Sequence, residues 1–242
     1  MILEKSMHPE WLSNSYLVAD HEGGSAVLID SGGPTEPLIE AAERLGVSVT
    51  HLLLTHADHD HIAGNDDYRR RFGTPVLGHP LAAERAELDG TIEDGAEVVS
   101  GDLRIRALHT PGHSPDHLAF VVDGSDCFAG DVLFDGTVGG TMRDSYTALK
   151  ASVMDVLMAL PAETRVHPGH TTPTTIGREW EANPFIRIWR GLDPEGDEPC
   201  TCFNRDARLV LFAPDYDGGH KGWVRWDAGG EDIAPGSQVK RA

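Results

Sequence analysis

Histidine and aspartate side chains crowd the segment Thr55–Gly64, THADHDHIAG, with three histidines and two aspartates inside residues 56–61. Imidazole and carboxylate groups are the ligands that borderline divalent metals such as zinc prefer, and a loop can bring them around an ion. A solvated polar loop would have a similar composition. The segment therefore indicates metal chemistry only if other ligands occur elsewhere in the chain.

Three further clusters supply such ligands, and each follows an apolar run. They are HTPGHSPDH with His113, AGDVLF with Asp131 and VHPGHTTPTT with His170. Asp131 comes directly after the apolar residues, where an unpaired carboxylate is costly unless a cation meets it. A lone histidine or aspartate at a strand end is more often structural, but four clusters in this order favour a metal site.

The elements that must position these clusters alternate between β-like and helical patterns up to about residue 190, which indicates an α+β fold. The predicted strands are Tyr16–Ala19, Ala26–Ile29, Val49–Leu54, Leu103–Leu108, Leu118–Val122, Asp126–Ala129 and Thr164–Val166. The predicted helices are Thr35–Leu45, Ile62–Phe72 and Tyr146–Leu160. Each cluster then lies just past the end of a strand.

The character of the chain changes near residue 192, after which Arg208–Ala213 and Lys221–Trp226 predict a β-hairpin. We expect a catalytic domain over residues 1–191 and a linker with a hairpin extension over 192–242. An extension of this length rarely folds alone, so it must pack on the main body. We expect it to shape a substrate pocket with Tyr216 and Trp226, although covering a sheet edge or making a dimer contact would explain it equally well.

Composition excludes several classes of protein. Lys+Arg 20 against Asp+Glu 39 gives a net charge of −19, which repels nucleic acid. No apolar run reaches the roughly 20 residues of a membrane span. Glu4 and Lys5 interrupt the position of a signal peptide, so we expect a cytoplasmic protein. Cys127, Cys200 and Cys202 are too few for a disulfide framework or a closed zinc site and are expected to be structural.

The ordered clusters resemble the metallo-β-lactamase fold superfamily, whose pattern is H-x-H-x-D-H, a second histidine segment, an aspartate in a G-D context and a final histidine. Within it the chain is most similar to hydroxyacylglutathione hydrolases (glyoxalase II), particularly the short forms. The grounds are TPGHSPDH, GDVLF followed by GTVGG, and PGHTTPTTIGREWEANPFI. The resemblance spans residues 14–190. It implies a four-layer αβ/βα sandwich, here with a short C-terminal β extension.

The resemblance also implies a ligand set for two divalent metal ions. One ion is expected on His56, Asp58 and His113, the second on Asp60, His61 and His170, with Asp131 bridging them. The chain departs from the family pattern at Asp58, which takes the place of the second histidine, while His59 falls in a position that does not ligate.

Residues around the ligands are expected to support them. Asp30, in VLIDSGG, matches an aspartate that hydrogen-bonds a ligand or its loop in such sites. His51, His109 and His117 would do likewise or serve as ordinary polar residues near strand ends.

Zinc is the expected metal by family habit. With Asp58 as a ligand, three carboxylates and a bridging hydroxide balance two divalent ions. The harder oxygen ligation moves the preference toward iron or manganese.

The expected activity is hydrolysis of a hydroxyacyl thioester. A metal-bound hydroxide, oriented by Asp60, would attack the carbonyl and release a thiolate. The expected partner is therefore a small thioester or ester, with neither nucleic acid nor membrane, and with a homodimer left open. The resemblance makes glutathione doubtful as the thiol carrier. Longer glyoxalase II enzymes bind the thiol with a C-terminal helical domain, whereas the C-terminal residues here predict β structure.

Two other enzymes fit the same pattern. A mononuclear iron enzyme of the persulfide dioxygenase type needs two histidines and one carboxylate, which His56, His113 and Asp131 supply. A lactonase or another ester hydrolase would use the same dimetal site. Retention of all seven candidate ligands argues against a nonenzymatic binding module.

Overall fold

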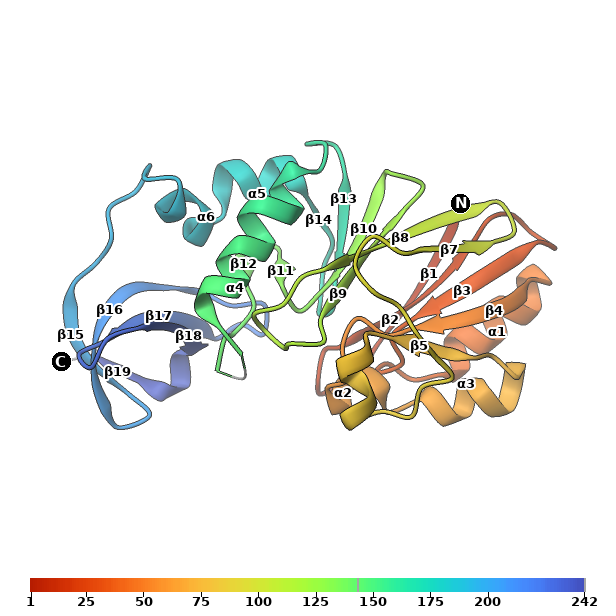
Figure 1. Ribbon diagram of the computed structural model, residues 1–242, viewed down its shortest axis with the longest axis horizontal. Helices are drawn as coiled ribbons and strands as arrows, with labels where there is room; N and C mark the ends of the chain where they lie inside the picture. The colour runs from red at the N-terminus through yellow and green to blue at the C-terminus, as the bar shows by residue number, and fades with distance from the viewer. Residues whose placement is uncertain (143, 242) are drawn as a thin grey trace. The chain divides into compact units, whose positions relative to one another are not determined.

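The computed structural model of the protein describes residues 1–142 and 144–241 and contains two compact units (Figure 1). The first unit comprises Met1–His109, Asp116–Gly130 and Gly169–Thr171, and the second is the rest of the described chain. Each unit is described by itself. Within the described residues, no helix combines the length and apolar character that a membrane crossing demands.

The first unit contains two groups of strands. One sheet has the order β1-β2-β3-β4-β5-β6, formed by Ile2–Met7, Asn14–Ala19, Ser25–Ile29, Ser48–Leu53, Val76–Gly78 and Gly90–Thr91. The other group has the order β10-β9-β8-β7, formed by Asp126–Gly130, Leu118–Val122, Leu103–His109 and Glu97–Ser100. The predicted strands Tyr16–Ala19 and Ala26–Ile29 are confirmed as β2 and β3, which pair antiparallel with Leu17 opposite Leu28. Strand β1 was not predicted; it pairs along the whole of β2.

Alternation along these strands divides the core of the first unit into two layers. Tyr16 and Val18 belong to a buried apolar cluster that also contains residues of β8, β9 and β10, Phe120 among them. Leu17, on the opposite face of β2, packs in a second cluster with the helices, including Leu38. Successive residues of a strand point to opposite faces, so a single run of apolar residues serves both layers.

The helical layer of the first unit consists of α1 (Glu36–Leu45), α2 (His59–Ile62) and α3 (Asn65–Phe72), with a 3₁₀ turn at Pro80–Glu84. Figure 1 shows α1 and α3 along one face of the first sheet. Helix α1 ends at Gly46, whose φ of 63° is left-handed, as the sequence predicted.

The helix predicted over Ile62–Phe72 is wrong at its start. The chain forms two helices separated by Ala63 and Gly64, and α2 begins at His59 inside the histidine cluster. At the break the Gly64 amide donates to the carbonyl of Ser31 at 2.9 Å instead of to a carbonyl of the helix, and a β-carbon there would lie 2.7 Å from that oxygen. The backbone of the cluster therefore turns against the loop after β3 instead of continuing as one helix.

The second unit begins with the loop that carries His113 and contains both hairpins and helices. Its elements up to residue 189 are β11 (Leu133–Phe134), β12 (Thr137–Val138), α4 (Tyr146–Ala151), β13 (Arg165–Pro168), β14 (Thr174–Thr175), α5 (Ile176–Ala182) and α6 (Pro184–Trp189). The helix predicted over Tyr146–Leu160 continues past α4 as a π turn, Ser152–Val156, and a 3₁₀ turn, Leu157–Ala159. At the change of pitch the Ser152 hydroxyl donates to the carbonyl of Pro111 at 2.7 Å.

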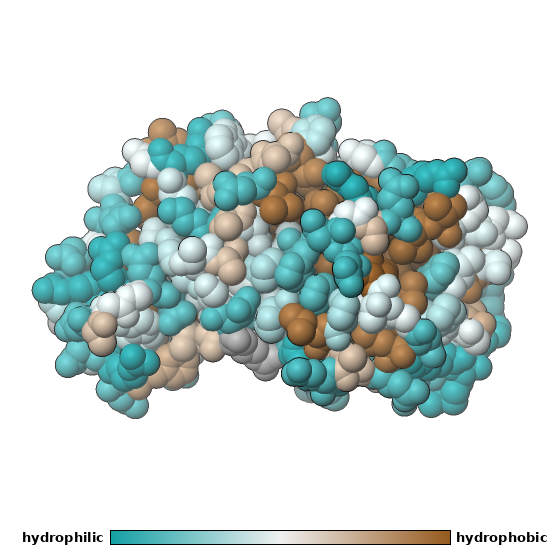
Figure 2. Space-filling model, viewed as in Figure 1, coloured by the Kyte–Doolittle hydropathy of each residue, from teal (hydrophilic) through white to brown (hydrophobic). Residues whose placement is uncertain are grey.

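The C-terminal residues form an antiparallel sheet of five strands in the order β18-β17-β16-β15-β19. The strands are β15 (Glu198–Cys202), β16 (Arg205–Pro214), β17 (His220–Trp226), β18 (Glu231–Pro235) and β19 (Val239–Arg241), with a 3₁₀ turn at Gly236–Gln238. The predicted hairpin is its centre, β16 and β17. Hydrophilic side chains cover most of these strands on the face drawn in Figure 2.

This C-terminal sheet packs on other parts of the second unit. The Trp223 ring lies 5.3 Å from that of Tyr146 in α4 and 6.2 Å from that of Trp189 in α6. Trp226, which we expected to line a pocket, is instead buried in the sheet's own core, and its indole nitrogen donates to Asp232 at 2.7 Å. The predicted domain boundary at residue 191 stays a prediction.

A buried acid and amide organise the turn between β11 and β12. Glu179 accepts hydrogen bonds from the Thr174 hydroxyl at 2.6 Å, from the Gly136 amide at 3.0 Å and from Asn183 at 2.8 Å. Asn183 also donates to the carbonyl of Thr137 at 3.1 Å. Burial raises the pKa of Glu179, and the three donors oppose that shift.

Replacing Glu179 tests this arrangement. Glu179→Ala should lower the free energy of unfolding by about 3 kcal/mol, because it leaves three donors in the interior without an acceptor. Glu179→Gln keeps the shape and one acceptor oxygen, which can serve Gly136 and Asn183 while its amide donates to the Thr174 hydroxyl, so it should cost about 1 kcal/mol or less. Urea denaturation of both variants measures the difference; equal losses would show that the volume of the side chain, and not its acceptors, is what matters.

Candidate metal centre

The Asp30 side chain connects two residues of the histidine cluster of the first unit, Thr55 and His61. Its carboxylate accepts from the amide of Thr55 at 2.8 Å, from the Thr55 hydroxyl at 2.7 Å and from Nδ1 of His61 at 2.9 Å. Asp30 is buried and has a φ of 55°, a left-handed conformation that aspartate tolerates better than most residues. The end of β3 and the end of β4 are thus fixed to each other through one side chain.

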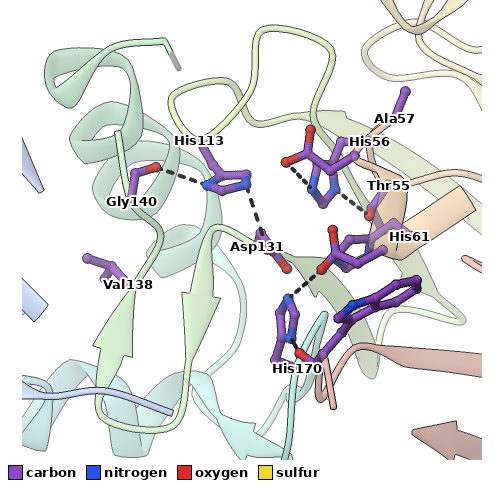
Figure 3. A network of polar contacts seen from close by, with 12 residues as sticks. Thr55, His56, Ala57, His61, His113, Asp131, Val138, Gly140 and His170 are labelled. Carbon is purple, nitrogen blue, oxygen red and sulfur yellow. Dashed lines mark hydrogen bonds and ion pairs between the residues drawn. The ribbon is translucent and has the colours of Figure 1, made fainter. Parts of the chain in front are cut away.

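The hydrogen bonds decide which ring nitrogen of each candidate histidine carries its proton. Nδ1 of His61 must donate, since a carboxylate only accepts. Nδ1 of His170 donates to the carbonyl of Trp11 at 3.0 Å. Nδ1 of His56 lies 3.0 Å from the Thr55 hydroxyl, whose single hydrogen already goes to Asp30, so this nitrogen donates as well. Each neutral ring therefore presents the lone pair of Nε2 (Figure 3).

These Nε2 atoms all face carboxylate oxygens at nearly one distance. In the first unit Nε2 of His61 and of His170 lie 3.7 and 3.5 Å from Oδ2 of Asp60. Nε2 of His56 lies 3.7 Å from Oδ2 of Asp58. Such separations are too long for good hydrogen bonds. Two ligands at about 2.1 Å from one tetrahedral ion would lie about 3.4 Å apart, so these pairs have the spacing of metal ligands.

Asp60, His61 and His170 form a three-residue set whose ligand atoms all lie within 4.8 Å of one another. The two histidines are buried, whereas the Asp60 side chain is 32% exposed and faces solvent. The set is tightly held, because a β-carbon at Gly32 would overlap the carbonyl oxygen of Asp60. Only glycine allows the loop after β3 to pass this close to the cluster.

Asp58 has a partner that the sequence analysis missed. The guanidinium of Arg85, beyond the 3₁₀ turn at Pro80–Glu84, donates to Oδ1 of Asp58 and to Oδ1 of Asp116, each at 2.5 Å. The other oxygen of Asp116 accepts from the amide of Ala57 at 2.9 Å. A carboxylate in the place of a neutral histidine is more stable beside a cation. The sequence pattern did not show which arginine or lysine would supply that cation.

The second unit brings together the other two candidates, His113 and Asp131. Nε2 of His113 lies 3.7 Å from Oδ2 of Asp131, and its Nδ1 donates to the carbonyl of Gly140 at 2.9 Å (Figure 3). The His113 loop reaches this place because Gly112 passes against α4, where a β-carbon would overlap the backbone of Leu149. The pair repeats the arrangement seen in the first unit.

The other histidines considered from the sequence, which are His51, His59, His109 and His117, have different surroundings. His59 is exposed and its ring meets the edge of Trp11 at 5.2 Å. His109 stacks on His79 at 4.4 Å, while Nδ1 of His51 contacts the Thr50 hydroxyl at 3.0 Å. His117 is buried with its ring 5.1 Å from that of His56.

The chain is similar to several known proteins. The Metallo-beta-lactamase superfamily model matches residues 8–170. Hydroxyacylglutathione hydrolase GloC of Haemophilus influenzae is 33% identical over 196 residues, which cover 72% of this chain and 92% of that protein. Among solved structures, ETHE1 from Myxococcus xanthus has a TM-score of 0.69 and 31% identity, covering 80% of this chain and 92% of that one.

A further solved structure, TTHA1623 in a di-iron-bound form, has a TM-score of 0.65 and 36% identity, covering 74% of this chain and 98% of that one. These neighbours confirm the expected α+β sandwich fold. The match to the family model covers most of the chain and contains the whole ordered ligand pattern from His56 to His170. The protein therefore belongs to the metallo-beta-lactamase superfamily.

Proposed function

We propose that the protein is a hydrolase that holds two divalent metal ions and cleaves a small thioester, with hydroxyacyl thioesters as the main substrate class. The observation that carries this proposal is the repeated geometry of the candidate ligands. Each of four imidazoles donates through Nδ1 to a fixed acceptor and turns Nε2 toward a carboxylate oxygen at 3.5–3.7 Å. Structural histidines have no need of that shared spacing.

The proposed ligand sets follow the superfamily order. Asp60, His61 and His170 would hold one ion, while His56, Asp58 and His113 would hold the other, with Asp131 shared. The similar protein TTHA1623 has been solved in a di-iron-bound form, which supports two ions and makes iron a candidate beside zinc. Manganese also fits the oxygen-rich ligand set.

Bound ions of this kind lower the pKa of a coordinated water to about 7 and polarise a substrate carbonyl. The protein's part is to orient the reacting groups. Asp60 is suited to this because it is partly exposed beside two buried histidines and can accept a hydrogen bond from water. His61 stays in one tautomer because Asp30 accepts from its Nδ1.

The thioester assignment rests on the relatives. GloC is named a hydroxyacylglutathione hydrolase, and 92% of its length aligns with this chain. A thiolate is a good leaving group, so such a reaction needs no strong general acid, and none is required of the ligand-bearing loops. The thiol carrier of this protein stays open, because the C-terminal sheet lies beyond the matched residues.

One observation favours a second candidate, a mononuclear iron oxygenase that uses His56, His113 and Asp131. Oδ1 of Asp58 is held by Arg85, and this ion pair competes with metal binding by the same carboxylate. A triad without Asp58 would leave open positions on a single iron.

Metal content separates the two candidates. The purified protein should contain close to two zinc, iron or manganese ions per chain by elemental analysis, and it should hydrolyse a hydroxyacyl thioester without consuming oxygen. Stripping with a chelator should abolish activity, and adding the metal back should restore it. One iron per chain together with oxygen uptake on a persulfide would establish the oxygenase instead.

Asp58 and His59 are adjacent and provide a matched pair of variants. Asp58→Ala should reduce the metal content from two ions to one and lower kcat/KM more than about 100-fold, since partners outside the ligand set alone cost about 10–100-fold. His59→Ala should retain both ions, because His59 is exposed and contacts Trp11. Asp58→His should still bind two ions and should favour zinc. The opposite pattern, with loss of metal only in His59→Ala, would refute the alignment of this loop.

A further inference from the structure

The segment 138–141 connects the C-terminal sheet to His113. Nδ1 of His113 donates to the carbonyl of Gly140 at 2.9 Å, so the position of that carbonyl fixes both the tautomer and the tilt of the ring (Figure 3). Nε2 of the same ring lies 3.7 Å from Asp131. A rotation of the Gly140 peptide would turn Nε2 away from this carboxylate.

The C-terminal sheet holds the segment on both sides of Gly140. On one side, Nζ of Lys221 in β17 donates to the carbonyl of Val138 at 2.8 Å. On the other side, the amide of Thr141 donates to the carbonyl of Ile233 at 2.9 Å, and its hydroxyl accepts from the amide of Ile233 at 2.8 Å. The same hydroxyl donates to Asp232 at 2.9 Å. Strands β17 and β18 therefore fix the two ends of a four-residue segment.

Lys221 is an unusual residue for this purpose, because its ammonium group is buried. It is 5% exposed, pairs with Asp215 at 3.1 Å and lies 5.2 and 5.1 Å from the rings of Phe134 and Tyr216. Burial lowers the pKa of Lys221, while the charges of Asp215, Asp131 and Asp217 oppose the shift. A buried ion pair contributes little net stability, so an orienting role accounts for it better than a stabilising one.

The other residues that hold the β11–β12 hairpin do not contact the segment 138–141 through these hydrogen bonds. Glu179 and Asn183 hold the hairpin at Gly136 and Thr137, on the turn itself. They come from the helices that follow His170, whereas the contacts to Val138 and Thr141 come from the C-terminal sheet. The turn and the segment after it are thus held by different parts of the second unit.

From these contacts we propose that Lys221 and Thr141 are positioning residues through which the C-terminal sheet sets the orientation of His113 as a metal ligand. The inference rests on the proposed dimetal function. It assigns the C-terminal sheet a part in the metal centre that does not require the sheet to touch the substrate.

The test compares paired variants of the full-length protein. Thr141→Val removes the hydroxyl but keeps the shape, and Thr141→Ser restores the hydroxyl. Lys221→Met combined with Asp215→Asn removes the buried ion pair without leaving an unpaired charge. Arg225→Met is the matched control, because Arg225 lies on the same strand and pairs with Glu195 and Glu231.

Cobalt(II) titration of the metal-free protein, followed by its visible absorption, measures the two sites separately. Thr141→Val and the Lys221 double variant should weaken the binding of one cobalt ion about 10-fold or more and leave the other unchanged. They should also lower kcat more than they change KM. Thr141→Ser and Arg225→Met should bind both ions as the unchanged protein does.

A second readout needs no metal. In the metal-free protein, ¹⁵N spectra of histidine should show a loss of the single Nδ1–H tautomer of His113 in Thr141→Val and not in Thr141→Ser. Unchanged cobalt affinities and an unchanged tautomer in a folded Thr141→Val or Lys221 variant would overturn the inference while leaving the dimetal proposal intact. Failure of the unchanged protein to bind a second cobalt ion would overturn both.

Discussion

The arrangement of the candidate site depends on one constraint, that each candidate ligand imidazole donates its Nδ1 proton to a fixed acceptor. A neutral histidine can ligate through Nε2 only when the other nitrogen is protonated, and the acceptor of that proton sets the plane of the ring. The protein uses a different acceptor for each ring: the Thr55 hydroxyl, the Asp30 carboxylate, and the carbonyls of Gly140 and Trp11. The loops after β1, β3, β4 and β12 supply these acceptors.

The same constraint explains which parts of the site could be predicted from the sequence. Ligand types are visible in the order of the clusters, and Asp30 could be identified because its acceptor is a side chain. Gly140 and Trp11 act through backbone carbonyls, which every residue has, so no pattern of residue types reveals them. Arg85 was missed for a related reason, since any arginine or lysine of the first unit could have met Asp58.

The elements were predictable where local chemistry decided them. Gly46 ends α1 where the sequence indicated, and the predicted strands Tyr16–Ala19 and Ala26–Ile29 pair with each other. The predicted helix is interrupted at Gly64, whose amide donates to the Ser31 carbonyl. This contact joins segments that are distant in the sequence, so local patterns did not reveal it. The C-terminal hairpin was predicted from its apolar strands. Strand β15, which contains Pro199, forms by pairing with β16, and the short β19 forms by pairing with β15.

Two cations of this acidic protein, the exposed Arg85 and the buried Lys221, have similar partners. Arg85 pairs with both Asp58 and Asp116, and Lys221 pairs with Asp215, so each positive charge lies against at least one carboxylate. As a proposed ligand in place of a histidine, Asp58 would add one negative charge, which Arg85 would offset at 2.5 Å. Ligation by Asp58 would then change the donor atom from nitrogen to oxygen with less change in local charge than the carboxylate alone would impose. In the proposed site the oxygen donor would favour harder ions, while the Arg85 guanidinium would limit the excess of negative charge that weakens the polarising power of bound ions.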